Sequence, residues 1–542
     1  MNKPLSAIFF VIGILLFSYQ SVVAQAPMIQ WQHCYGGSAD EVSGSNIIYL
    51  SDSSYILTGT TYSNDGDISG NHGVGDYWVF KIDQYGNLIW QKCYGGSTYD
   101  ASTSMVEGYD GGLIVCGVAS SNDGEVTSNH SVAPLFDVWL IKLDIFGNLQ
   151  WQKCFGGSGD DISNHIIRTT DSAYVFVGQT TSNDGDVGGN HSLDTNDIWL
   201  VKIDTVGNIL WHRCFGGSRD DEANSVIQTN DGGFMIAGRT YSNDGDITYT
   251  HDTTGNYDDM WVIKTDSLGN LQWQRCIGGS GHEIPYSIIQ DVNGNYLLAG
   301  STNSNDGDIS GNHQAWYYDL FALKLNSSGN ILWQKCYGGT GNEFEYSAVE
   351  DSLGGLEIFG STESNDGDVS GNHSILNQDF WLIGIDSIGN LQWQKCYGGS
   401  NHEYARALIS TSDGGYLVSG STISNDGDVS NHHLPINSTD IWVVKLSAAH
   451  VGLQYPENYI PAIQCFYDPV QSSINLNYYS ENADRINLTL YDVTGRTIQS
   501  QRMNSFIGMN NQNVETFRLT PGIYLVRLET ESGSVTRKVV VE

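Results

Sequence analysis

A segment of the form Trp-x-x-Cys, followed one residue later by Gly-Gly, occurs seven times along the 542-residue chain. The copies begin at Trp31, Trp90, Trp151, Trp211, Trp273, Trp333 and Trp393, at spacings of 59 to 62 residues. A repeat of nearly constant length means that one supersecondary unit recurs and that each unit packs on its neighbours. The sequence therefore predicts an array of seven similar modules.

Each unit contains four short runs of β-branched and aromatic residues, which are typical of strands. In the fourth copy these runs are EANSVIQT, GFMIAGRT, MWVIKTD and LQWQRC, with the turn sequences NDGG and SLGN between the outer pairs. Glycines in such turns accept positive φ, as tight hairpins require. Four antiparallel strands in each of seven units predict an all-β fold, a seven-bladed β-propeller.

The two ends of the repeat predict that the ring is closed. The last unit has a third strand at residues 440–446, but no Trp-x-x-Cys strand follows it, and an isolated copy lies near the N-terminus at residues 29–37. If that N-terminal strand completes the seventh blade, no strand edge is left open to pair with other chains. We predict a propeller over residues 25–450.

The N-terminal residues 1–24 have the composition of a secretory signal peptide, with a short basic start, an apolar run at 5–17 and small residues before Gln25. No second apolar run of spanning length follows, so we expect no transmembrane segment after cleavage. Lys and Arg total 24 against 61 Asp and Glu, a formal charge of −37. Such a polyanion is a poor partner for nucleic acid but suits solubility and divalent cations.

Beyond a linker at residues 451–463, residues 464–542 alternate apolar and polar residues and predict a small β-sandwich. This segment resembles the type A C-terminal sorting domain of the type IX (Por) secretion system, through YDVTGR at 491–496, LTPGIY at 519–524 and the basic RKVVV near its end. The opening FYDP at 466–469 differs from the usual Tyr-Pro-Asn-Pro of that family. The resemblance implies export by the type IX machinery, removal of the tail, and a product that is anchored at the outer-membrane surface or released.

The repeat string itself, with GGSxDD, SNDGD and DxWxxKxDxxGN as its fixed parts, resembles the β-propeller repeats of secreted bacterial surface proteins. Thirteen of the 14 Trp occupy two repeat positions, which predicts packing between blades. Seven of the nine Cys share one repeat position. Equivalent strands of successive blades lie too far apart for disulfides, so we expect these Cys to be buried small hydrophobes.

A polar ten-mer, SNDGDISGNH in the first copy, lies between the second and third strands of each unit. We favour turn chemistry, in which Asn, Asp and Ser oxygens bond to nearby backbone amides. The alternative is calcium, although the spacing of the acids does not fit an EF-hand loop. The candidate calcium ligands are Asn64, Asp65, Asp67, Asp184, Asp186, Asp306, Asp308, Asp366, Asp368, Asp426 and Asp428.

One His per unit closes the ten-mer, and we expect it to be a hydrogen-bonding partner of the loop rather than a metal ligand. We assign it to His72, His130, His191, His251, His313, His373 and His432. A carboxylate also recurs in the connection between successive units, at Glu41, Asp100, Asp161, Asp221, Glu283, Glu343 and Glu403. We expect these acids and the ten-mers to form an acidic rim on one loop-rich, functional face.

After the His the loops diverge in length and character, as contact loops on a rigid frame do. Trp316, Tyr317 and Tyr318 are adjacent on one such loop, and Tyr257 lies on another. Exposed aromatic residues of this kind form stacking platforms for sugars or anchor protein partners, although they can also pack over the blade rim.

These features favour an exported binding or adhesion module whose variable loops take a protein or glycan. The alternative is a secreted carbohydrate-active or other hydrolytic enzyme on the same scaffold. Six polar residues stand outside the shared repeat pattern, and no known catalytic motif joins them: His165, Arg219, His282, Glu345, His402 and Arg406. We therefore predict no catalytic residues and no cofactor other than calcium.

Overall fold

The structure is a computed structural model, and it describes residues 24–451 apart from 193, 352–353, 375 and 434–437. In the C-terminal segment it describes 464–541 apart from 469–472, 481–484, 493–494, 505–507, 516–518, 521 and 531–532. The signal peptide and nearly all of the linker lie outside these residues. Backbone contacts divide the chain into the unit Ala24–Val451 and a second unit that contains the described C-terminal strands.

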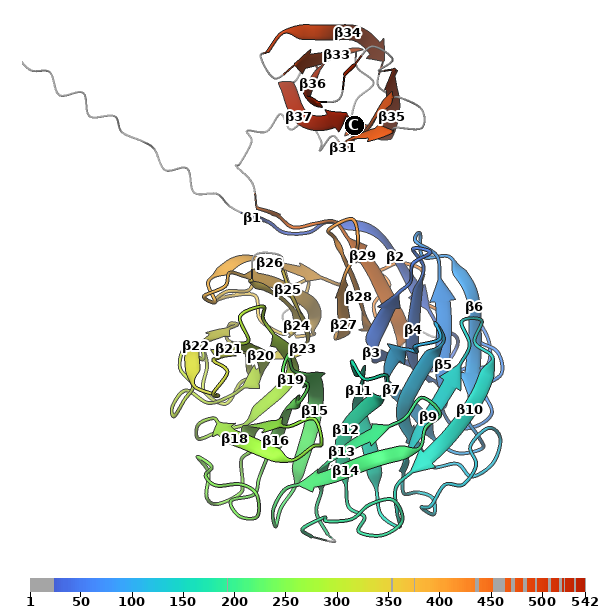
Figure 1. The fold of residues 1–542 in the computed structure, drawn as a ribbon, viewed down its shortest axis with the longest axis vertical. Coiled ribbons are helices and arrows are strands. Elements are labelled where there is room, and N and C mark those ends of the chain that lie inside the picture. Colours follow the sequence, from blue (N-terminus) through green and yellow to red (C-terminus); the bar gives the residue numbers. More distant parts are fainter. Residues whose placement is uncertain are drawn as a thin grey trace, which may run out of the picture. The chain divides into compact units, whose positions relative to one another are not determined.

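The unit Ala24–Val451 consists of seven four-stranded antiparallel sheets that follow one another around a ring (Figure 1). The first blade contains β3 (Glu41–Tyr49), β4 (Tyr55–Thr61), β5 (Asp76–Ile82) and β6 (Leu88–Tyr94). The second contains β7 (Asp100–Glu107), β8 (Leu113–Ala119), β9 (Asp137–Leu143) and β10 (Leu149–Phe155). The third contains β11 (Asp161–Arg168), β12 (Tyr174–Thr180), β13 (Asp197–Ile203) and β14 (Ile209–Phe215).

The fourth blade contains β15 (Asp221–Gln228), β16 (Phe234–Thr240), β17 (Asp259–Thr265) and β18 (Leu271–Ile277). The fifth contains β19 (Glu283–Gln290), β20 (Tyr296–Thr302), β21 (Asp319–Leu325) and β22 (Ile331–Tyr337). The sixth contains β23 (Glu343–Glu350), β24 (Leu356–Thr362), β25 (Asp379–Ile385) and β26 (Leu391–Tyr397). The seventh contains β27 (Glu403–Ser410), β28 (Tyr416–Thr422) and β29 (Asp440–Leu446), and takes its fourth strand from β2 (Ile29–Tyr35).

The N-terminal strand closes the ring, which confirms the prediction from the sequence. β2 runs antiparallel to β29, with Trp31 opposite Lys445 and Cys34 opposite Trp442. Beside it, the short strand β1 (Ala24–Gln25) pairs with β30 (His450–Val451). The first and last parts of the propeller are thus joined by main-chain hydrogen bonds, and the seventh blade has the same four strands as the others.

The third strand of each blade forms the centre of the core. Its seven residues are buried in all blades except the fifth, where Lys324 is half-buried. The large rings of this strand are fully buried at Trp78, Trp139, Trp199, Trp261, Phe321, Trp381 and Trp442. Each such burial contributes about 2–3 kcal/mol, so this repeat position accounts for much of the stability of the ring.

The Trp of the Trp-x-x-Cys strand packs between blades in a different way. Trp211 lies against Gly269, which belongs to the hairpin turn between β17 and β18 of the next blade. Gly269 has φ +76°, and a Cβ added there would meet the Trp211 ring at 2.7 Å. Between the seventh and first blades the indole also forms a hydrogen bond, in which Trp31 Nε1 donates to the carbonyl of Gln84 at 3.0 Å.

In four copies the residue after the Cys is a Tyr, and its hydroxyl reinforces the same interface. Tyr337 donates its hydroxyl proton to the carbonyl of Gly389 in the next blade, at 2.6 Å. In the sixth blade the neighbouring hairpin is replaced by the N-terminal segment, and Tyr397 bonds instead to the carbonyl of Pro27 at 2.7 Å. The N-terminal segment therefore replaces an outer strand in two ways. It completes the sheet of the seventh blade, and it accepts the hydrogen bond from the sixth blade.

The cysteines of the propeller are free thiols. Eight are unpaired among the described residues, and all are buried or half-buried. Burial raises the pKa of Cys116 to about 11, so this thiol stays protonated and unreactive at neutral pH. They behave as small core side chains, as expected.

The C-terminal unit is a two-sheet sandwich, as predicted. One sheet has the order β31-β32-β35 and the other β34-β33-β36-β37. Apolar side chains of both sheets share one core, for example Leu476, Leu488 and Val526. The strand bounds are β31 (Gln464–Asp468), β32 (Ser473–Ser480), β33 (Arg485–Asp492), β34 (Thr497–Asn504), β35 (Gly508–Glu515), β36 (Gly522–Thr530) and β37 (Gly533–Val541).

Two glycines of the fourth blade test the contact between Trp and hairpin. Gly269→Ala places a methyl group against Trp211 at a positive φ, and we expect a loss of about 2–4 kcal/mol in the free energy of unfolding. Gly232→Ala is the matched control, because Gly232 has φ +82° but no atom within 4 Å of the added Cβ, so only backbone strain of about 1 kcal/mol remains. Urea unfolding of both variants measures the difference, and equal losses would contradict the packing role of Trp211.

Candidate functional site

The polar ten-mer folds back onto the connection that leads into its own blade. In the first blade the backbone N–H of Ser38 donates to Asp65 Oδ1 and that of Ala39 to Ser63 Oγ, both at 2.8 Å. Gly66, at φ +66°, lies so close to this connection that an added Cβ would be 2.4 Å from a carbonyl oxygen. The ten-mer is therefore a turn that holds the connection in place, as the favoured interpretation predicted.

The oxygens considered as calcium ligands are used in the same way in the other blades. The equivalents of Asp65 at Asp184, Asp306, Asp366 and Asp426 each accept a backbone N–H at 2.7–2.8 Å. The equivalents of Asp67 at Asp186, Asp368 and Asp428 accept a Gly N–H at 3.3–3.4 Å. Across the described residues no three or more His, Cys, Asp or Glu side chains are grouped so as to hold a metal ion. The geometry thus favours turn chemistry over calcium at Asn64, Asp65, Asp67, Asp308 and their equivalents.

The seven carboxylates expected to form an acidic rim are inside the protein, so that prediction is wrong. Glu41, Asp100, Asp161, Asp221, Glu283, Glu343 and Glu403 all have no exposed surface. Each begins an innermost strand, and the Gly-Gly turn before it folds over its side chain. Glu403 shows the pattern, since it accepts the Gly399 N–H at 2.9 Å and the Thr422 hydroxyl at 2.7 Å. These acids hold the connection to the blade.

The His bridges neighbouring blades in six of the seven units, and in the second unit His130 contacts Asp137 of its own blade. His313 Nδ1 lies 2.6 Å from Asp319 in its own blade, and its Nε2 lies 3.7 Å from Asp368 in the next. The same bridge closes the ring, where His433 lies 2.8 Å from Asp440 and 3.7 Å from Asp67 of the first blade.

The His of the last unit is therefore His433, and its assignment to His432 is wrong. In the last ten-mer Asn431, at φ +65°, stands where the first has Gly70, so His432 takes the place of Asn71 and His433 that of His72. The His432 Nε2 is buried and lies 2.9 Å from the carbonyl of Ser438.

The four aromatic residues predicted as ligand contacts separate into two groups. Tyr257 and Tyr318 both lie against His282, with ring centroids 5.1 and 6.4 Å from it. Trp316 and Tyr317 remain on the surface, with exposed fractions of 79% and 43%. The structure thus leaves two aromatic side chains available on this loop, rather than a platform of four.

A different cluster of unlike residues lies in the central channel, and it arises from β-bulges. The innermost strand of every blade shifts register against the second strand near its middle. In blades two to seven this leaves one residue without a partner, and in the first blade three. The residues concerned are Gly44, Ser45, Asn46, Thr103, Asn164, Asn224, Tyr286, Tyr346 and Arg406.

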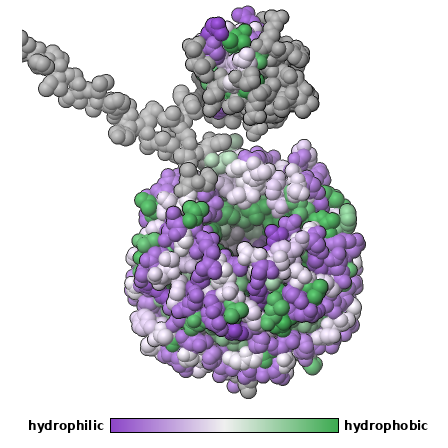
Figure 2. Space-filling model, viewed as in Figure 1, coloured by the Kyte–Doolittle hydropathy of each residue, from purple (hydrophilic) through white to green (hydrophobic). Residues whose placement is uncertain are grey.

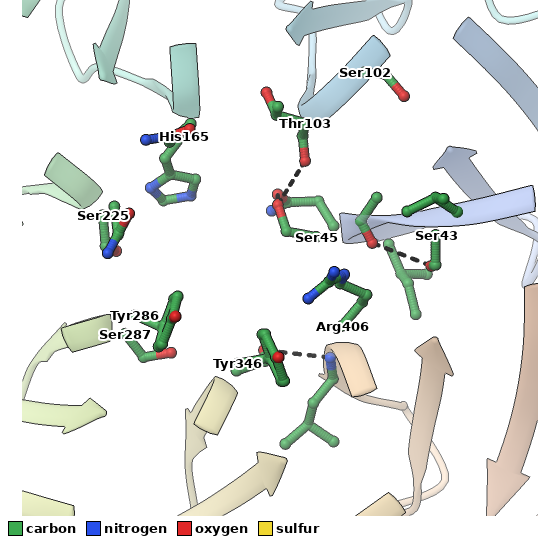
Figure 3. Close-up of a pocket in the computed structure, with 18 of the residues that line it drawn as sticks. Ser43, Ser45, Ser102, Thr103, His165, Ser225, Tyr286, Ser287, Tyr346 and Arg406 are labelled. Carbon is green, nitrogen blue, oxygen red and sulfur yellow. Dashed lines mark hydrogen bonds between the residues drawn. The ribbon is translucent and has the colours of Figure 1, made fainter. Parts of the chain in front are cut away.

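All of these bulge residues line one cavity of about 710 Å³ (Figure 3). Figure 2 shows the ring hollowed at its centre. The cavity reaches the loop-bearing end of the first two blades, where Val42, Thr60, Tyr99 and Ala101 line it. A bulge turns one extra side chain out of the sheet, so each blade presents one residue to the channel at this level.

On one side of the channel the bulge residues are small and polar and join the blades to one another. Each donates a hydrogen bond to a backbone carbonyl of the next innermost strand. The bonds are Ser45 to Thr103 at 2.6 Å, Thr103 to Ser163 at 2.8 Å, Asn164 to Ala223 at 2.8 Å and Asn224 to Pro285 at 2.9 Å.

On the other side the series changes to large aromatic and cationic side chains. The rings of Tyr286 and Tyr346 have centroids 5.4 Å apart, and the guanidinium of Arg406 lies 4.7 Å from the centre of the Tyr346 ring. Burial raises the pKa of Tyr286, which therefore stays a neutral phenol. The channel consequently has two unlike walls, although the ring around it repeats seven times.

Two further residues that occur in only one copy of the repeat lie at this channel. His165 lines the cavity, and its Nδ1 accepts the backbone N–H of Val226 at 3.1 Å. Burial lowers the pKa of His165 to about 4, so the ring is neutral and Nε2 carries the proton. Glu345 is fully buried behind the wall, where it accepts the Ser287 hydroxyl at 2.9 Å, and burial raises its pKa to about 8.

One feature of the sequence does indicate this site, namely a variable position inside the innermost strands. The fourth residue of the innermost strand reads Thr, Asn, Asn, Tyr, Tyr and Arg in blades two to seven, whereas the first residue is always Asp or Glu. Variation at one register inside a strand indicates a side chain that the shared core does not constrain. The direction of that side chain could not be predicted, because the bulge breaks the regular alternation of side chains along the strand.

Residues 466–542 match the family described as the secretion system C-terminal sorting domain. The protein is therefore a propeller-repeat protein that carries a type IX sorting tail, which indicates export to the cell surface or beyond. The described residues include no helix with the length and hydropathy needed to cross a membrane.

One characterised relative and several solved structures resemble the chain more distantly. The chain is 23% identical over 228 residues to the regulatory protein FlaEY of Caulobacter vibrioides. This match covers 40% of the chain and only 24% of the length of FlaEY. A hydrazine synthase of Kuenenia stuttgartiensis matches with 13% identity and a TM-score of 0.43 over 72% of this chain and 95% of that one. A puromycin hydrolase matches with 10% identity and a TM-score of 0.42 over 81% and 58%. Similarity at this level says nothing about activity.

The buried acids and the His bridges make stability depend on pH. Burial raises the pKa of Glu403 to about 7, so the folded state holds a proton that the unfolded state releases near 4.5. The hydrogen bond to Asp440 raises the pKa of His433, whose contribution is likewise present below 6.5 and lost as the pH rises further. We expect the protein to resist urea better at pH 5 than at pH 8.

Two variants assign this pH dependence. Glu403→Gln keeps an acceptor but removes the titrating group, and should reduce the difference between pH 5 and pH 8 by on the order of 2 kcal/mol. Glu107→Gln changes a side chain that is 44% exposed and should leave the difference unaltered. Equal urea midpoints at the two pH values, or no effect of Glu403→Gln, would contradict the role given to the buried acids.

Proposed function

We propose that the protein is an exported ligand-binding propeller whose ligand enters the central channel from the loop-bearing face. One observation carries this proposal. The acids and histidines that recur in every blade are bonded within the ring, whereas the residues that differ between blades face a single open cavity. Binding needs such an asymmetric set of groups on a rigid frame, and cavities of about 300–1,000 Å³ are typical of small-ligand sites.

Trp316 and Tyr317 form a second, outer contact in this proposal. They are the exposed aromatic side chains of a loop whose sequence differs from all its counterparts. Aromatic residues add large contact area at low entropic cost, so this loop suits the part of a protein or glycan that extends beyond the channel. The exposed acids of the rim around them belong to the ten-mers, as Asp65 and Asp184 do, and not to the seven buried carboxylates.

The sorting tail sets the place of action. Type IX machinery recognises the C-terminal unit, and the tail is then removed, leaving the propeller outside the cell or attached to the outer-membrane surface. An extracellular protein or glycan is therefore the partner. Cleavage at the N-terminal signal belongs to the same route.

The hydrolase alternative has less support from the geometry. The His–Asp pairs resemble parts of a catalytic triad, but the two ring nitrogens of His313 face two carboxylates, and among the described residues no hydroxyl nucleophile bonds to them. His165 uses one nitrogen to accept a backbone N–H and is neutral. A binding role needs none of these groups to react.

A glycan and protein array probed with the purified protein tests the proposal. We expect a ligand whose binding weakens about tenfold or more in Tyr346→Ala, because a channel wall is removed, and more moderately in Trp316→Ala. Tyr85→Ala is the control, since Tyr85 is 65% exposed on a hairpin away from the channel. A ligand indifferent to both site variants would contradict the proposed site, and release of soluble product from a bound polysaccharide would replace binding by hydrolysis.

A further inference from the structure

The wall of the central channel has an unusual charge for this protein. The chain carries 61 acidic residues, yet neither Asp nor Glu is among the residues that line the cavity. Arg406 is the one residue with a permanent charge in that lining. Glu345, which precedes the wall residue Tyr346 in the chain, is fully buried behind the wall, and its raised pKa keeps it neutral at pH 7. The channel is thus a cationic site in a polyanionic molecule.

Arg406 is half-buried and has no anionic partner among the described residues, unlike the lysines on the third strands of the blades. The lysines of the third strands each form an ion pair with an Asp, as Lys202 does with Asp171 at 2.7 Å and Lys324 with Asp291 at 2.8 Å. Within the part of the chain that the structure describes, the guanidinium of Arg406 has neither an ion pair nor a hydrogen bond, and its contact is with the Tyr346 ring. Its five N–H donors remain available to a ligand.

The Tyr346 contact holds the guanidinium ready for a planar anion. A cation 4.7 Å from a ring centre is stabilised by the π face, which fixes the plane of the group without using its N–H edges. Figure 3 shows Arg406 reaching into the open centre of the channel. A guanidinium presented in this way matches a carboxylate through two parallel hydrogen bonds.

The opposite wall offers acceptors for hydroxyl groups. Both N–H groups of the Asn164 amide are in use, since they donate to Gln179 at 3.0 Å and to the Ala223 carbonyl at 2.8 Å. The Asn224 amide donates to the Pro285 carbonyl at 2.9 Å. The side-chain oxygens of both amides can accept hydrogen bonds from a ligand, and the Nε2–H of His165 can donate one. A ligand with both a carboxylate and hydroxyl groups satisfies the two walls together.

We propose that the channel binds a sugar acid, with its carboxylate on Arg406 and its hydroxyl groups on Asn164 and Asn224. This inference rests on the proposed function and gives it a chemical class. The ligand is a uronate, either as a free monosaccharide or as the end of an acidic polysaccharide. The cavity of about 710 Å³ has room for one or two sugar rings.

Calorimetric titration of the purified protein with D-glucuronate, D-galacturonate and D-mannuronate tests this, with D-glucose as the neutral control. We expect at least one uronate to bind and glucose not to, because glucose lacks the carboxylate. Arg406→Gln should weaken uronate binding by about tenfold or more, and Arg406→Lys, which keeps the charge but not the fork, should fall between. Arg168→Gln is the matched control, since Arg168 is 44% exposed and lies outside the cavity.

Melting curves of the variants separate a lost ligand contact from a lost fold. Arg406 bonds to no described group, so Arg406→Gln should melt within a few degrees of the wild type. Titration with a short oligogalacturonide decides the source, because tighter binding than the monosaccharide indicates a polymer end. N-acetylglycine, a carboxylate without sugar hydroxyls, should bind at least tenfold more weakly than the preferred uronate.

Three results would overturn the inference: no uronate binds, binding is unaltered in Arg406→Gln, or N-acetylglycine binds as well as the uronates. These results are distinct from failure of the proposed function. If the arrays reveal a neutral ligand whose binding depends on Tyr346, the channel remains the binding site and only the uronate assignment falls. If array binding does not depend on Tyr346 or Trp316, the proposed site itself falls.

Discussion

The rest of this structure depends on the pairing of the N-terminal strand β2 with β29. That pairing joins the ends of a chain of seven blades, so the hydrogen bonds of one short ladder hold the ring closed. An open array would expose a strand edge and would leave Tyr397 without the Pro27 carbonyl that it bonds. Because neighbouring blades also contact one another through Trp rings, and in most interfaces through a His bridge or a Tyr hydroxyl, closure at one point stabilises the interfaces around the ring.

A closed ring also makes the channel possible. Seven innermost strands surround a common axis, and the bulge in each turns one side chain toward that axis. The small polar side chains of Ser45, Thr103, Asn164 and Asn224 form hydrogen bonds to the next blade and stabilise the channel wall. Tyr286, Tyr346 and Arg406 do not have this structural role. Much of the asymmetry of the channel thus lies at one register of the innermost strands, while the repeated residues maintain the frame. Repetition and specificity occupy different positions of the same unit.

The fold could be predicted from the sequence because its determinants are periodic. Spacing of the Trp-x-x-Cys segments, the hairpin turns and the isolated N-terminal copy together define seven closed blades. The sites were harder to predict, because the burial and the orientation of a side chain do not follow from its residue type. Glu403 resembles a surface acid but lies under a Gly-Gly turn. His432 follows Asn, as the His of most other ten-mers does, yet Asn431 occupies the place of the ten-mer's second glycine, so His433 forms the bridge. The bulge that directs Arg406 into the channel breaks the alternation from which orientation is normally inferred.

Native-state hydrogen exchange, measured amide by amide, tests ring closure most directly. If β2 completes the seventh blade, the amides of β2 that pair with β29 should exchange as slowly as those of the outer strands of other blades, such as β6 and β10, and in the same cooperative opening. Fast exchange in β2 while β29 and the remaining blades stay protected would show that the N-terminal strand is not part of the sheet. The closed ring, and with it the channel site, would then be wrong.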